Sequence, residues 1–162
     1  MTEIKAFLIR FASLLIFLWL LFGVCFGIAP MYGEDMFPRI SSGDMLLYYR
    51  LGKTYNSGDV LVFKKEGKLR SGRVVAHGGD SVEITGEGEL KVNGNIVVEN
   101  NVFYKTYPYS KKKVSYPLDL KKDEVFLLCD YREGGKDSRY FGAISKKEIK
   151  GKVITVLRRS NL

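Results

Sequence analysis

The sequence is poor in the residue types that build disulfide frameworks and metal centres. Its 162 residues include only two cysteines and one histidine. Cys25 lies in an apolar run and Cys129 in a predicted strand, so the two thiols are not expected to meet. The single histidine, His77, cannot form a metal-ligand cluster by itself. We therefore expect no disulfide-stapled fold, no metal and no other cofactor.

Long hydrophobic runs are also scarce, because only one segment is long enough to cross a membrane. Residues 11–29 are apolar except for Ser13, and as a helix they would span about 28 Å. Lys5 and Arg10 precede the run and the first charges after it are acidic, which places the N-terminus in the cytoplasm. The predicted organisation is a cytoplasmic N-terminus (1–10), a transmembrane signal anchor (11–29) and an extracellular domain (30–162).

A cleavable signal peptide is the alternative interpretation of this run. Such peptides usually have a shorter apolar region, of about 7–15 residues, that ends at a small-x-small site. Residues 27–29, Gly-Ile-Ala, imitate such a site only weakly. The length of the run therefore favours an uncleaved anchor.

Acidic residues are fewer than basic ones, 18 against 26, and the formal net charge is +8. The lysines and arginines form dispersed pairs and short runs, such as residues 111–113. Beside a membrane, these charges suit anionic lipid heads or acidic wall polymers, and elsewhere they keep a domain soluble. No nucleic-acid-binding module accompanies them, so we do not expect nucleic acid as a partner.

Helical periodicity almost disappears after Pro30. Short segments rich in β-branched and aromatic residues follow, separated by glycine and aspartate. Asn93-Gly94 is a strong two-residue hairpin signal, and one short helix is expected to begin near Ser145. This pattern predicts a mainly antiparallel β domain. The expected strands are residues 45–49, 60–63, 74–76, 82–85, 90–92, 96–99, 125–129 and 153–157. The tyrosine-rich stretch 100–122 is expected to be an extended hairpin or a mobile loop.

Four short blocks carry the most specific signal. They are Gly-Glu-Asp-Met-Phe-Pro (33–38), Gly-Asp-Val-Leu-Val-Phe (58–63), Gly-Arg-Val-Val-Ala-His-Gly-Gly-Asp (72–80), and Cys-Asp-Tyr-Arg (129–132) with Asp-Ser-Arg-Tyr-Phe-Gly (137–142). In this order, after an N-terminal anchor, they resemble the type I signal peptidases, membrane-tethered serine proteases of the Ser/Lys type. The resemblance extends to about residue 157 and implies an antiparallel, partly open β-barrel domain preceded by one transmembrane helix.

The resemblance also implies that the catalytic residues have been replaced. In the family, a serine precedes Met-x-Pro, a lysine precedes Arg-Val, and a second serine two residues before Asp-Ser-Arg orients the lysine. Asp35, Gly72 and Gly135 stand at these positions. A serine hydroxyl needs an adjacent base, and a lysine is a base only where desolvation keeps it neutral. We therefore expect no intact Ser/Lys mechanism.

Other motif positions are retained. Gly33 stands where the family has a small residue beside its oxyanion site, and Met36 and Pro38 complete the motif around Asp35. We expect these four residues to line a peptide-binding cleft. Four charged residues match the family's ionic block and are expected to be structural: Asp130, Arg132, Asp137 and Arg139.

The remaining residues include a few possible replacement catalysts. His77 and three serines, Ser41, Ser42 and Ser71, have no visible partner and are expected to be turn residues. Two carboxylates that share a proton can activate water, and Asp137 is the candidate second acid for Asp35. We expect Asp137 to pair with Arg139 instead, and Asp35 to stay ionised beside a cation such as Arg39.

The resemblance therefore predicts peptide binding without cleavage. With Asp35 in place of the serine and Gly72 in place of the lysine, the chain resembles the signal-peptidase-like proteins that assist pilus assembly at the surface of Gram-positive bacteria. They are thought to act as chaperones or scaffolds alongside a sortase and pilin subunits. The expected partners are pilin, sortase and the membrane, with homo-oligomers left open. Two alternatives remain: an unconventional peptidase that uses Asp35, and a pseudoenzyme that regulates an active signal peptidase through its anchor.

Overall fold

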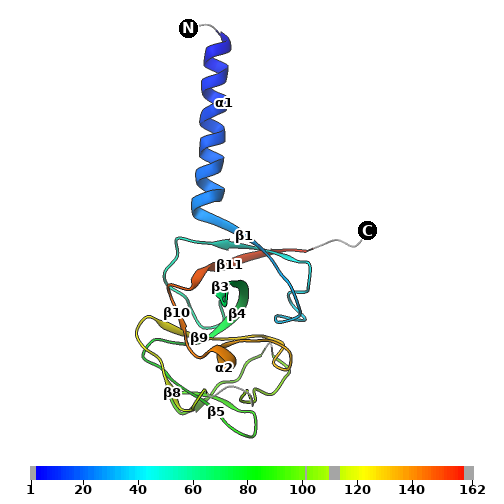
Figure 1. Ribbon diagram of the computed structural model, residues 1–162, viewed down its shortest axis with the longest axis vertical. Coiled ribbons are helices and arrows are strands. Elements are labelled where there is room, and N and C mark those ends of the chain that lie inside the picture. The colour runs from blue at the N-terminus through cyan, green and yellow to red at the C-terminus, as the bar shows by residue number, and fades with distance from the viewer. Residues whose placement is uncertain (1–2, 101, 110–113, 159–162) are drawn as a thin grey trace.

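The computed structural model describes residues 3–100, 102–109 and 114–158 (Figure 1). Its first element is an apolar helix, α1 (Glu3–Leu20), which continues as one π-helical turn, η1 (Leu21–Cys25). None of the side chains of α1 is buried, and the helix stands clear of the β domain. Residues 3–25 are long and apolar enough to span a membrane, a property that a signal sequence shares.

The helix ends earlier than the predicted anchor, because residues 26–29 belong to strand β1 (Phe26–Pro30). This strand pairs along its whole length with β2 (Met45–Tyr49). Gly27 permits the pairing, since a Cβ added there would lie 2.3 Å from the Tyr48 ring. Close packing against β2 therefore takes these residues out of the helix, although their composition is apolar.

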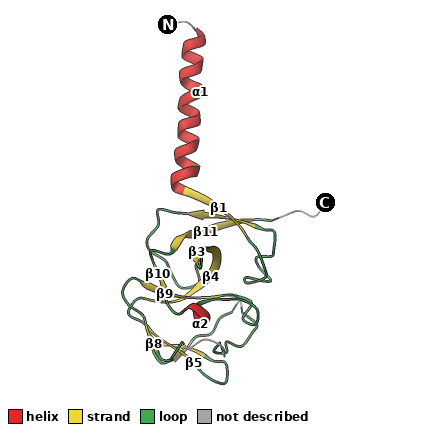
Figure 2. Ribbon diagram, in the orientation of Figure 1, coloured by secondary structure: helices red, strands yellow, loops and turns green. Residues whose placement is uncertain are grey.

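The β domain consists of two antiparallel sheets (Figure 2). The larger has the order β1-β2-β11-β3-β4-β9-β10 and the smaller the order β7-β6-β5-β8. The further strands of the large sheet are β3 (Val60–Lys65), β4 (Lys68–His77), β9 (Glu124–Leu128), β10 (Ile144–Ser145) and β11 (Ile149–Leu157). Those of the small sheet are β5 (Ser81–Ile84), β6 (Leu90–Val92), β7 (Asn95–Ile96) and β8 (Leu118–Asp119). One short helix, α2 (Ser138–Phe141), follows β9. The predicted mainly antiparallel β architecture is confirmed.

Three hydrophobic clusters hold the domain together. One contains Phe63 and Leu127 of the large sheet, and a second joins Phe126 to the small sheet. The third packs Met36 against residues of β1 and β2, among them Ala29 and Leu46. Burying one such side chain completely stabilises the fold by about 1.5–3 kcal/mol. The end of β1 and the motif around residue 35 are therefore anchored by the core.

The local predictions had mixed outcomes. Asn93 and Gly94 have φ values of 52° and 78° and connect β6 to β7, so the predicted hairpin is confirmed. The helix predicted near Ser145 is wrong, because Ser145 ends β10 and its N–H donates to Glu148 Oε2 at 3.1 Å. A local turn thus replaces the helix. In the stretch 100–122, residues 101 and 110–113 lie outside the described residues, and β8 is the strand that the described part contains.

Candidate functional site

A pocket of about 430 Å³ lies between the end of β1 and the beginning of β4. Most of its lining is apolar, and among its described lining residues the charged ones are Asp35, Lys68 and Arg70. The full lining is Ala29, Pro30, Met31, Tyr32, Asp35, Leu46, Val62, Lys68, Leu69, Arg70 and Ser71. The pocket therefore combines an apolar wall with a small group of opposite charges.

Asp35 is the acid of this pocket, and it is half-buried. Its backbone carbonyl accepts a hydrogen bond from Tyr131 N–H at 3.0 Å, which holds the motif against the segment after β9. No hydrogen bond or ion pair joins its carboxylate to another of the described residues. Burial raises the pKa of Asp35, the positive charge of Arg70 opposes this rise, and the negative charge of Asp137 adds to it. The cation that acts on Asp35 is thus Arg70, a residue that the sequence did not single out.

The raised pKa predicts how Asp35 affects stability. Because the folded state favours the protonated carboxyl, this group stabilises the fold below its ordinary pKa of 3.8, and that contribution is lost as pH rises through the raised value. The Asp35→Asn variant should therefore unfold at a higher temperature than the unchanged protein at pH 7. The difference should shrink as pH falls towards 4. Thermal unfolding of both proteins across this range measures it, and a variant that is less stable at neutral pH would contradict the prediction.

The other two replaced positions are closed by neighbouring side chains. A Cβ at Gly72 would lie 3.1 Å from Leu127 Cβ, which is a tight contact. At Gly135 an added Cβ would lie 2.4 Å from the Cys129 sulfur. Cys129 is fully buried and therefore occupies the space that a side chain at position 135 would need. Burial first, and then the negative charges of Asp137 and Asp35, raise the pKa of the Cys129 thiol, so it stays protonated and unreactive.

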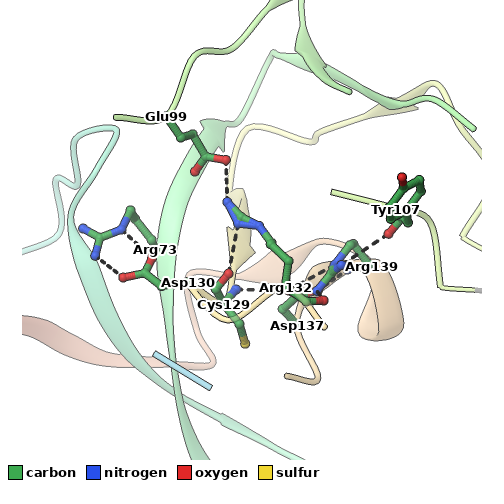
Figure 3. A network of polar contacts seen from close by, with 8 residues as sticks. All are labelled: Arg73, Glu99, Tyr107, Cys129, Asp130, Arg132, Asp137 and Arg139. Carbon is green, nitrogen blue, oxygen red and sulfur yellow. Dashed lines mark hydrogen bonds and ion pairs between the residues drawn. The ribbon is translucent and has the colours of Figure 1, made fainter. Parts of the chain in front are cut away.

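The ionic block takes part in three ion pairs around the segment after β9, one buried and two partly buried (Figure 3). Arg73, on β4, donates through Nε to Asp130 Oδ1 at 2.8 Å. Arg132 binds Glu99 and also donates to the Cys129 carbonyl at 2.9 Å. Figure 3 shows Arg73 beside Asp130, and Arg132 extending towards Glu99. These two pairs thus tie the segment after β9 to β4 and to the chain that follows β7.

The third pair joins Asp137 to Arg139, and four hydrogen-bond donors surround the Asp137 carboxylate. Its carboxylate accepts from Arg139 Nε and Nη2, each at 2.9 Å, from the Arg139 backbone N–H at 3.0 Å, and from Cys129 N–H at 3.0 Å. Arg139 also donates to the Tyr107 carbonyl at 3.3 Å. The expected pairing of Asp137 with Arg139 is therefore present. A carboxylate held this way has no reason to share a proton with Asp35, although its charge acts on Asp35.

The four residues expected to line a cleft have different surroundings. Asp35 lines the pocket, whereas Met36 is fully buried in the cluster that it forms with residues of β1 and β2. Gly33 is exposed and donates to Ser42 Oγ at 3.4 Å, and Pro38 is also exposed. The motif therefore contributes one side chain to the pocket and one to the core, because the chain turns between them.

The candidate replacement catalysts are engaged elsewhere. Ser71 is buried and its hydroxyl donates to Met31 Sδ at 3.2 Å. Ser41 lies in a turn, where its N–H donates to Asp44 Oδ2 at 2.9 Å. His77 is at the end of β4, where its Nε2 lies 2.9 Å from the Tyr55 carbonyl. Among the described residues no group of three His, Cys, Asp or Glu side chains lies close enough to hold a metal ion.

Arg70 and Lys68 are the site residues that sequence reasoning missed. Both are among the many basic residues dispersed along the sequence, and nothing in their spacing indicates a functional site. Their position on β4, ahead of Gly72, was the one available signal, since alternate strand residues share a face. Glu99 and Arg73 were missed because their partners, Arg132 and Asp130, are far away in the sequence.

Comparison with known proteins agrees with this fold. A family model described as signal peptidase, peptidase S26, matches residues 4–157. An inactive signal peptidase IA from Staphylococcus aureus (strain MRSA252) is 24% identical over 132 residues, which cover 74% of this chain and 72% of that protein. A signal peptidase I from Bacillus caldolyticus is 32% identical over 142 residues, with 75% and 73% covered.

A solved structure shows the same fold. The crystal structure of a signal peptidase I from Enterococcus faecalis V583 superposes with a TM-score of 0.51 at 23% identity. The match covers 63% of this chain and 97% of that structure. The expected resemblance is confirmed, and this chain belongs to the signal peptidase S26 family.

Proposed function

We propose that this chain is a non-catalytic signal peptidase homologue that binds extended peptide segments in the pocket beside Asp35. The observation that carries this proposal is a pocket with open strand edges at a site without a nucleophile and base. At the three positions where the family resemblance expects Ser, Lys and Ser, the chain has Asp35, Gly72 and Gly135. The pocket itself remains, at about 430 Å³.

Two unpaired strand edges adjoin this pocket. β1 is the outermost strand of the large sheet, so one of its edges has no strand beside it. On β4, pairing with β9 begins at Arg73, and the preceding residues of β4 are paired only with β3. The pocket is lined by residues 29–32, at and just after the end of β1, and by residues 68–71, which form the unpaired edge of β4. An extended peptide can add to such edges through backbone hydrogen bonds while its side chains enter the pocket.

The site offers no pair of groups for peptide-bond hydrolysis. A carboxylate at position 35 needs a second acid to activate water, and Asp137 is held by four donors from Arg139 and Cys129. The hydroxyl of Ser71 is bonded to Met31. The Staphylococcus aureus relative described as inactive supports the same conclusion by analogy.

Within this role we propose that the protein acts as a chaperone or scaffold in the assembly of surface pili. The support is the Asp35 and Gly72 pair, which resembles the signal-peptidase-like proteins of Gram-positive pilus systems. Pilin subunits or a sortase are the proposed partners, bound through the degenerate cleft. Direct association of the purified proteins, lost when the pocket is altered, is the test of this assignment.

We also propose that α1 anchors the domain at the outer face of the cell membrane. α1 is apolar and exposed along its length, with Lys5 and Arg10 in its first half. An apolar surface extends from it onto the sheet, where Ile28, Met45 and Leu157 are 49%, 42% and 49% exposed. Met45 pairs with both Pro30 and Leu157, so these residues share one face of the sheet. Contact with lipid would cover this face.

A cleavage assay tests the proposal. The full-length protein in detergent is incubated with a signal-peptide substrate that has a small-x-small site, beside the Asp35→Ala variant and an active signal peptidase. We expect the active enzyme to cleave the substrate and neither form of this protein to do so, because the described residues of the site contain no paired nucleophile and base.

Two outcomes decide between the alternatives. Binding of the uncut substrate without cleavage supports a chaperone or scaffold role. Cleavage that is lost in Asp35→Ala would show a carboxylate-dependent peptidase and would overturn the proposal.

A further inference from the structure

We propose that the pocket recognises a free C-terminal carboxylate at the end of an extended peptide, and that Arg70 is the residue that binds it. This inference rests on the proposed peptide binding and names the part of the peptide that the pocket selects. It follows from the surroundings of Arg70, from the charges of the pocket and from its apolar wall.

Arg70 is a cation whose side chain has no hydrogen-bond acceptor in the described part of the chain. Its Nε is buried and has no hydrogen-bond partner among the described residues. Its guanidinium lies 5.1 Å from the centre of the Phe141 ring, which orients it but accepts no strong hydrogen bond. A buried donor without a partner is costly, and a guanidinium binds a carboxylate through two parallel hydrogen bonds. The missing partner of Arg70 is therefore an anion with planar oxygens.

The charges of the pocket favour an anionic ligand. Lys68 and Arg70 both line it, and Asp35 is the acid among its described lining residues. Asp35 does not neutralise Arg70 by contact, because no ion pair joins them. With two cations and one acid, the described lining carries a net positive charge when Asp35 is ionised, and this charge favours an anionic ligand.

The apolar wall indicates that this anion belongs to a peptide. Ala29, Leu46, Val62 and Leu69 line the same pocket. They suit a small or medium apolar side chain next to the carboxylate, as in other sites with an apolar wall and few polar groups. The open edges of β1 and β4 then hold the residues before the terminus. An internal peptide segment would also fit the edges, but its amides carry no charge for Arg70.

Asp35 limits the affinity for such a ligand. The groups that face it are Arg70 from β4, Asp137 before α2 and the Cys129 thiol after β9. A second carboxylate beside Asp35 is repelled when Asp35 is ionised and accepted when it is protonated. Affinity should therefore rise as pH falls towards the pKa of Asp35, down to the point where the peptide carboxylate itself becomes protonated.

Two forms of one peptide test the inference. A fluorescein-labelled extended peptide that ends in alanine is prepared with a free C-terminal carboxylate and with a C-terminal amide. Binding of each to the full-length protein in zwitterionic detergent is measured by fluorescence anisotropy. We expect the free acid to bind about tenfold more tightly or better, since a charge-assisted hydrogen bond exceeds 1.4 kcal/mol.

Variants assign the effect to its residues. Arg70→Gln should remove the preference for the acid. Should that variant fail to fold, Arg70→Lys is the second variant, and it should keep only part of the preference. Asp35→Asn should increase the affinity for the acid about tenfold and change that for the amide much less, because it removes the charge that repels a carboxylate. It should also abolish the pH dependence.

The possible outcomes are distinguishable. Equal binding of acid and amide would overturn carboxylate recognition and leave peptide binding intact, whereas binding of neither would overturn both proposals. A preference for the acid that persists in Arg70→Gln would overturn the role of Arg70. Displacement of the acid peptide by an anionic phospholipid, but not by a zwitterionic one, would show that the site binds a lipid phosphate.

Discussion

Replacing Arg139 by methionine is expected to lower the free energy of unfolding by about 3–5 kcal/mol. Arg139 and Asp137 are both almost completely buried, with side chains 3% and 1% exposed. Methionine fills much of the arginine volume but leaves the Asp137 carboxylate buried without its counter-charge. Two backbone N–H groups, of Cys129 and residue 139, would remain as its donors. The loss is therefore electrostatic rather than a loss of packing.

Thermal unfolding of the full-length protein in detergent measures this effect, and the midpoint should fall by about 10 °C or more. The matched control is Lys152→Met, which breaks an ion pair of the same length, 2.9 Å, with Asp59. Because Lys152 is 40% exposed, its loss should cost less than about 1 kcal/mol. Equal effects of the two substitutions would show that burial does not determine the strength of the Arg139 pair.

Restoring a serine at position 135 is expected to destabilise the protein by about 1–3 kcal/mol. The new Cβ would meet the Cys129 sulfur at 2.4 Å and the Cys129 Cβ at 2.6 Å, and both atoms are fixed in the core. Cys129→Gly in the same chain should recover most of the lost stability, because it removes both atoms. The double-mutant cycle should therefore show a favourable coupling of at least about 1 kcal/mol.

The control for this experiment is Gly86→Ser, since a Cβ at Gly86 would meet no atom within 4 Å. That change should alter stability by less than about 0.5 kcal/mol. A neutral Gly135→Ser substitution would mean that Cys129 does not fill the site. The expected result has a functional consequence. Restoring the three family residues at 35, 72 and 135 would not rebuild the site, because Cys129 has to change as well.

Packing at Gly72 adds to this consequence. A lysine there would need a neutral amine near pH 7, and the positive charge of Arg70 would favour that neutral form. The obstacle is space, because a Cβ at Gly72 would lie 3.1 Å from Leu127 Cβ and 3.5 Å from the Phe63 ring. The replaced positions and Cys129 thus form a packed arrangement that restoring the serine and lysine alone would not reopen.

The sequence by itself determined the features that depend on local patterns. The apolar run predicted a helix, alternating β-branched residues predicted most strands, and Asn93-Gly94 predicted its hairpin, because each depends on neighbouring residues. The blocks that carry the family resemblance were also readable, including Asp130, Arg132, Asp137 and Arg139. The sequence failed where local signals were weak, as at Ser145 and in the short strands β8 and β10. It also failed at residues 26–29, whose apolar composition predicted helix but which pair with β2 as part of β1.

Only the tertiary structure decided what surrounds each site residue. Asp35, Arg70 and Cys129 come from three separate segments, and their proximity depends on the curvature of the sheet and on the pairing of β4 with β9. The same holds for Arg132 and Glu99, which are 33 residues apart. The physical reason is that charge and packing act through space. A sequence pattern shows which residues share a face of one element, whereas the burial and neighbours of an ionisable group depend on every element packed around it.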